Sequence, residues 1–143
     1  MSDDLNYGFA GDIIEKLIKK YNKSIRHTGS LDLTFSELIY LLAIKSDRMI
    51  TMSELAQIVD VSMSTATVMV GKLVNYGLVE RIRDSGDRRQ VYIRMLEKGE
   101  SVYSSIQKER EKVVEKVMGI FDDNEKKFVF EALIKVYKNL DNI

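Results

Sequence analysis

The sequence predicts a mainly α-helical protein that carries one small β-hairpin, an α+β fold. Apolar residues recur at helical spacing over most of the chain, and no proline among the 143 residues interrupts them. One stretch alternates apolar and polar residues on either side of a turn, which is typical of a hairpin. The length fits one domain of ordinary size, and 45% hydrophobic residues are enough for a core.

Residues 8–27 form the first predicted helix, with isoleucines and leucines on one side and lysines opposite. A capping box at Thr34–Glu37 begins a second helix that runs to about Lys45. Met49 and Ile50 follow as a short apolar link, which we interpret as a small strand.

Two short helices come next. A capping box at Thr51–Glu54 opens a helix over residues 54–59, and residues 60–61 make a tight turn. Ser62 can cap the following helix, residues 64–76, which ends at Gly77. This order predicts a helix-turn-helix.

Residues 81–94 are the predicted hairpin. They hold five arginines (81, 83, 88, 89 and 94) against two aspartates (84 and 87), a local charge of +3 on a chain with 22 basic and 22 acidic residues. A basic hairpin directly after a helix-turn-helix is the winged helix-turn-helix arrangement, which indicates DNA binding.

Two further helices complete the chain, one over residues 97–120 and one opened by a capping pattern at Asp122–Glu125. Their apolar faces, like that of the first helix, are wider than a small lobe can cover. We therefore expect residues 34–96 to form a DNA-binding lobe, and residues 1–33 and 97–143 to form a helical dimerisation region of a homodimer. The alternative is a monomeric helical bundle.

Residues 33–99 resemble the MarR family of bacterial and archaeal transcriptional regulators. The resemblance lies in these short motifs: Leu33-Thr34, Ser53-Glu-Leu-Ala56, Val61-Ser-Met-Ser-Thr65, Leu73 with Gly77-Leu-Val79, Asp87-Arg-Arg89 and Glu97-Lys-Gly99. It implies a homodimer with intertwined terminal helices and one winged helix-turn-helix per subunit. It also implies a small ligand that binds between the dimer helices and the lobe.

The chain departs from the family pattern in three respects. Val68 stands where an arginine is common, and Leu96 stands where a threonine usually caps the next helix. The chain has no cysteine and one histidine, so the peroxide-sensing and zinc-sensing chemistries of the family are not expected.

DNA contacts are expected from the beginning of the second helix of the helix-turn-helix and from the hairpin, because the former meets base edges and a wing arginine can enter the minor groove. An ordinary solvated surface is the alternative for each residue. The predicted DNA-binding residues are Ser62, Ser64, Thr65, Thr67, Lys72, Arg83, Asp87, Arg88 and Arg89.

A small aromatic or anionic effector is the other expected ligand, because tyrosine hydroxyls and cations bind phenolates and carboxylates. The candidate residues are Tyr21, His27, Tyr40 and Arg48. Core packing of the tyrosines and a structural or exposed histidine are the alternatives.

Other function classes find little support. The sequence has no cysteine pair, no phosphate-binding glycine loop and no paired carboxylates at a plausible site, so we expect no catalytic residue, cofactor or metal. It has no apolar run long enough for a membrane span and no secretory signal, which favours the cytoplasm. The preferred function is a ligand-responsive homodimeric repressor that binds a pseudo-palindromic operator. The alternative is a winged-helix dimer that acts as a protein-interaction module or antirepressor without operator binding.

Overall fold

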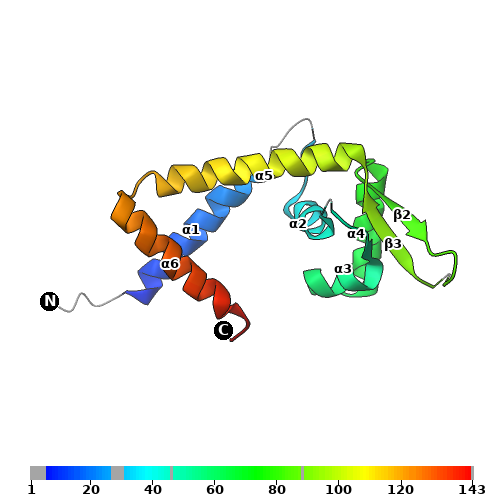
Figure 1. The fold of residues 1–143 in the computed structure, drawn as a ribbon, viewed down its shortest axis with the longest axis horizontal. Helices are drawn as coiled ribbons and strands as arrows, with labels where there is room; N and C mark the ends of the chain where they lie inside the picture. Colours follow the sequence, from blue (N-terminus) through cyan, green and yellow to red (C-terminus); the bar gives the residue numbers. More distant parts are fainter. Residues whose placement is uncertain (1–5, 27–30, 46, 88, 143) are drawn as a thin grey trace. The chain divides into compact units, whose positions relative to one another are not determined.

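The computed structural model describes residues 6–26, 31–45, 47–87 and 89–142, and it confirms the predicted mainly helical fold with a small sheet (Figure 1). The chain divides into two compact units, Met1–Arg110 and Glu111–Ile143. The helices are α1 (Tyr7–Arg26), α2 (Phe35–Ile44), α3 (Met52–Val59), α4 (Met63–Asn75), α5 (Glu97–Met118) and α6 (Asp123–Lys138), followed by a short 3-10 helix (Leu140–Asn142). The strands are β1 (Ile50–Thr51), β2 (Val79–Arg83) and β3 (Val91–Met95).

Local sequence signals set the helix starts, as predicted. Capping boxes open α2, α3 and α6, where Thr34, Thr51 and Asp122 accept from a backbone amide and a glutamate three residues later accepts in return. Ser62 caps α4 by accepting the Thr65 amide at 3.2 Å. Gly77 follows α4 with φ at 71°, a conformation that glycine adopts without strain.

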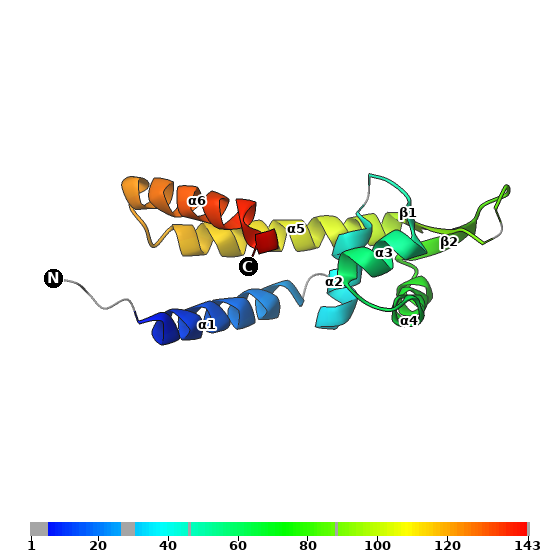
Figure 2. The same ribbon diagram turned by 90° about the horizontal axis from the view of Figure 1, so that it is seen from below.

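The sheet of the described residues has the order β1-β3-β2, with antiparallel pairing throughout. β2 and β3 form the predicted hairpin, in which Arg83 lies opposite Val91 and Val79 lies opposite Met95. β1 lies one residue later than the expected strand, and Ile50 pairs with Ile93 of β3. In Figure 2 the tip of the hairpin extends beyond α3 and α4 of the same unit.

The core of the first unit lies between α2, α3, α4 and the sheet. Leu55, Leu73 and Ile93 are fully buried there, and Leu41 of α2 joins them. Burial of such apolar surface contributes roughly 25 cal/mol per Å² to the free energy of folding, and it is the main contribution that stabilises short helices.

The outer helices differ from this core. None of the described α6 residues is buried, and α1 buries only Ile25. Of the described helices, none is both long enough and apolar enough to cross a membrane.

Candidate nucleic-acid interface

The α3–α4 pair forms the predicted helix-turn-helix. Asp60 ends α3 in the left-handed conformation, with φ and ψ both 55°, and its amide donates to the carbonyls of Ala56 and Gln57. α4 then packs its inner side, Ala66, Val70 and Leu73, into the core. The opposite side of α4 is left facing outward.

Hydroxyl groups crowd the first turn of α4, as predicted. Ser62 Oγ lies 2.9 Å from Ser64 Oγ and 2.9 Å from Thr65 Oγ1, and all three residues are exposed. We call these three residues the hydroxyl cluster. Thr67, one turn further on, is also exposed, and its hydroxyl donates to the Met63 carbonyl at 2.7 Å. The helix therefore presents small polar groups and no charge in its first two turns.

Lys72 is exposed on α4, and it is part of an electrostatic contact with α2 that the sequence did not predict. The Tyr76 hydroxyl, at the end of α4, donates to Glu37 Oε1 at 3.2 Å. Burial raises the pKa of Glu37, but bonds from Thr34 and Tyr76, with nearby Lys72, outweigh burial and hold that pKa below its ordinary 4.5. The bond to Glu37 raises the pKa of Tyr76 in turn. Glu37 thus joins the start of α2 to the end of α4.

The two faces of the hairpin carry different charges. Residues opposite each other in an antiparallel pair share a face, so Arg81 and Arg83 lie on the face of the buried residues Ile93 and Met95. Glu80 and Arg94 share the other face, where they form an ion pair. Arg83, a predicted DNA contact, is therefore on the side of the hairpin that packs toward the helices.

A hollow of about 450 Å³ opens between the hairpin and the helix-turn-helix. Arg81, Arg83 and Arg89 line it from the hairpin side, and Met63 and Thr67 line it from α4. We call this the arginine hollow; its other lining residues are Thr51, Met52, Ser53, Gln90 and Val91. Arginine side chains bind anionic groups such as phosphates, so the arginine hollow is the candidate site for DNA phosphates.

Arg81 has a role that the sequence did not indicate. Its guanidinium donates to the Thr67 carbonyl at 2.7 Å and so joins β2 to the middle of α4. The alternation of apolar and polar residues in the hairpin could have indicated the face on which Arg81 lies. The hydrogen bond itself could not be predicted in this way, because it joins residues 14 positions apart.

The tip of the hairpin is held by its two aspartates. Asp84 Oδ1 accepts the Gly86 amide at 2.8 Å, and Asp87 Oδ1 accepts the Arg89 amide at 3.0 Å. Asp87, a predicted DNA-binding residue, thus fixes the backbone of Arg89. Arg88, the other predicted wing arginine, lies outside the described residues.

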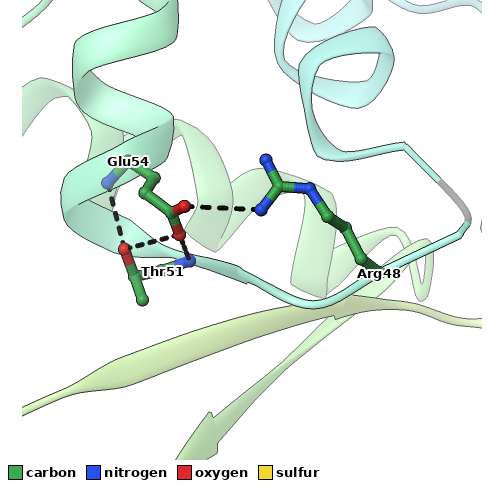
Figure 3. Close-up of polar contacts among 3 residues, drawn as sticks. All are labelled: Arg48, Thr51 and Glu54. Atoms are coloured by element: carbon green, nitrogen blue, oxygen red, sulfur yellow. Dashed lines mark hydrogen bonds and ion pairs between the residues drawn. The ribbon is translucent and has the colours of Figure 1, made fainter.

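The start of α3 is braced from the segment before β1, as Figure 3 shows. Glu54 accepts from the Thr51 amide at 2.9 Å, from the Thr51 hydroxyl at 3.0 Å and from Arg48 Nη1 at 3.3 Å. These partners, the Thr51 backbone first, lower the pKa of Glu54. Arg48, one of the effector candidates, thus extends a capping box.

The other effector candidates make separate contacts. The Tyr21 hydroxyl on α1 accepts from Arg110 of α5. Tyr40 of α2 is 3% exposed, burial raises its pKa, and its hydroxyl has no partner among the described residues. His27 lies outside the described part of the chain. The structure gathers the DNA candidates around α4 and the hairpin, whereas Tyr21, Tyr40 and Arg48 have different partners.

Comparison with known proteins agrees with this geometry. The MarR family model matches residues 31–90, which contain α2, α3, α4 and β2 and end just before β3. This segment of the chain is similar to the MarR family, as its short motifs predicted. The relatives that match the chain are HTH-type transcriptional regulators, in agreement with the predicted regulatory role.

Individual relatives align well beyond the matched segment. The uncharacterized HTH-type transcriptional regulator YybA of Bacillus subtilis (strain 168) is 29% identical over 78% of this chain and 74% of its own length. A MarR family protein from Bacillus stearothermophilus superposes with a TM-score of 0.80, covering 94% of this chain and 92% of that one at 24% identity. Streptococcus pneumoniae FabT, solved in complex with DNA, superposes with a TM-score of 0.77 at 21% identity over 96% of each chain. These likenesses establish the winged-helix fold.

Proposed function

We propose that the chain is a MarR-family regulator that acts by binding double-stranded DNA, as a homodimeric repressor of a pseudo-palindromic operator. The arginine hollow carries the proposal, because it places Arg81, Arg83 and Arg89 beside the exposed side of α4. In a helix-turn-helix this side enters the major groove, while the flanking cations contact phosphates or the minor groove. FabT, which has the same fold, was solved in complex with DNA, and this supports DNA binding.

The homodimer is the second part of the proposal. Leu133, Ile134 and Tyr137 of α6 are each more than half exposed, as are Phe9 and Ile14 of α1. Apolar surface of this extent is rare on a folded monomer, and a second copy of the chain would cover it. A twofold dimer would then place two α4 helices roughly 34 Å apart, the spacing of successive turns of the major groove.

A response to a small aromatic or anionic ligand is the third part. Tyr40 supports it most directly among the candidates, since its buried hydroxyl has no partner within the described part of the chain. The Tyr21 hydroxyl already accepts a hydrogen bond from Arg110, and Arg48 already donates one to Glu54.

Salt dependence of DNA affinity tests the proposal. The double variant Arg83→Ala, Arg89→Ala should bind a duplex more weakly than the wild type, and its log–log slope against salt should be flatter by about 0.9 for each phosphate that the variant no longer neutralises. The control is Arg94→Ala, which removes one positive charge from the opposite face of the same hairpin. It should leave the slope almost unchanged.

Fluorescence anisotropy with duplexes selected from a random-sequence library provides the measurement. A folded double variant with wild-type affinity and slope would remove the hairpin from the mechanism. A wild-type protein that enriches no duplex would refute DNA binding and favour the protein-interaction alternative.

A further inference from the structure

The outward side of α4 offers unusually few groups that can distinguish bases by hydrogen bonding. From Ser62 to Gly71 the helix carries no arginine, lysine, asparagine, glutamine or acidic residue. Those are the side chains that make bidentate or charged contacts to guanine, adenine and cytosine edges. The hydroxyls of Ser62, Ser64, Thr65 and Thr67 are the only polar side chains in this stretch.

Most of these hydroxyl hydrogens already have acceptors. The two contacts within the hydroxyl cluster use two of its three hydrogens. Thr67 donates its own hydrogen to the Met63 carbonyl. One hydroxyl hydrogen therefore remains for DNA, and a single hydroxyl, which can donate or accept, discriminates poorly between bases.

Apolar groups occupy the remaining outward surface. Val68 is 64% exposed and Met63 is 50% exposed. Val68 lies four residues beyond Ser64 and three beyond Thr65, so it shares the outward face of α4 with the hydroxyl cluster. A valine in a helix has one strongly preferred rotamer, so little side-chain entropy is lost when it contacts a ligand, whereas a methionine must be ordered.

We propose that Val68 is a specificity-determining residue that selects thymine by packing against its C5-methyl group in the major groove. Thymine is the only base of unmodified DNA that presents a methyl group there, and apolar side chains are its matching partners. This inference rests on the proposed DNA-binding function and adds the base that the helix selects. The operator half-site should contain a thymine at the position that Val68 contacts.

Removal of single methyl groups tests the inference. A duplex is first selected with the wild-type protein from a random-sequence library, and each thymine of both half-sites is then replaced in turn by deoxyuridine, which lacks only the methyl group. At the Val68 position the substitution should weaken wild-type binding about fourfold per half-site, the equivalent of about 0.8 kcal/mol for a buried methyl group. In Val68→Ala the same substitution should have much less effect.

Val74→Ala provides the matched control. It makes the same chemical change on the same helix, at a side chain that is 37% exposed and six residues further along, and it should retain the full deoxyuridine effect. The inference would be overturned if deoxyuridine weakened binding equally in the wild type and in Val68→Ala, or if the selected half-sites contained no thymine. Either result would leave the proposed DNA binding intact. Failure to enrich any duplex would instead refute the proposed function, and the inference with it.

Discussion

At the residue scale, two tyrosines of the first unit have opposite hydrogen-bond situations. Tyr76 donates to the carboxylate of Glu37, whereas the hydroxyl of Tyr40 is buried without a partner among the described residues. A bond to a charged group contributes about 1.5–3 kcal/mol, and a buried hydroxyl without a partner costs about 1–3 kcal/mol. The same substitution should therefore have opposite effects at the two positions.

Tyr76→Phe should lower the free energy of unfolding, but by less than the loss of a fully buried bond, since Tyr76 is only half-buried and solvent weakens the bond. Tyr40→Phe should leave the free energy unchanged or raise it. Urea denaturation at one fixed protein concentration measures both variants. Equal destabilisation by the two substitutions would show that the Tyr40 hydroxyl does have a partner in the assembled protein.

At the element scale, one glycine sets how closely α5 approaches the first strand of the hairpin. A Cβ atom at Gly99 would lie 2.0 Å from the carbonyl oxygen of Leu78 and 2.8 Å from Met95 Cγ. The first neighbour is backbone and cannot rotate away, so any side chain there must push α5 from the residue that precedes β2.

Gly99→Ala should accordingly reduce stability by about 1–3 kcal/mol or more, the range for overpacking a core. Gly71→Ala in α4 is the matched control, because the new Cβ would meet only the end of the Arg81 side chain, at 3.5 Å. It should stabilise the protein by about 0.5–1 kcal/mol through helix propensity. Thermal unfolding followed by circular dichroism compares the two, and a stable Gly99→Ala protein would contradict the close packing.

At the scale of the whole molecule, α6 has too little buried surface to be stable alone. α6 has no buried residue among those described, and an isolated helix of 16 residues is marginal in water. The proposed homodimer accounts for its stability, because a second copy would bury the apolar side of the helix.

Leu133→Ala should therefore raise the dissociation constant of the dimer, about tenfold for each 1.4 kcal/mol of burial energy that is removed. Lys135→Ala, on the same helix, should leave the constant close to that of the wild type. Sedimentation equilibrium at micromolar concentrations measures it. A wild-type protein that sediments as a stable monomer would contradict the homodimer.

The sequence by itself determined where most elements begin and end. Capping boxes, apolar spacing and Gly77 predicted α1 to α6 and the hairpin to within a few residues, because these signals act between neighbours in the chain. Ser62, Ser64 and Thr65 could be placed at the start of α4 for the same reason. The similarity to the MarR family was also predictable, since its motifs lie within residues 33–99 and the family model matches residues 31–90.

Only the tertiary structure decided which side chains meet. The pairing register placed Arg81 and Arg83 on the inner face of the hairpin and Arg94 on the outer one. The bond from Tyr76 to Glu37 spans 39 residues, and neither residue type indicates that partner by itself. Such contacts depend on how several helices pack around a shared core. The arginine hollow therefore exists only in the folded chain, where the basic hairpin lies beside the helix-turn-helix.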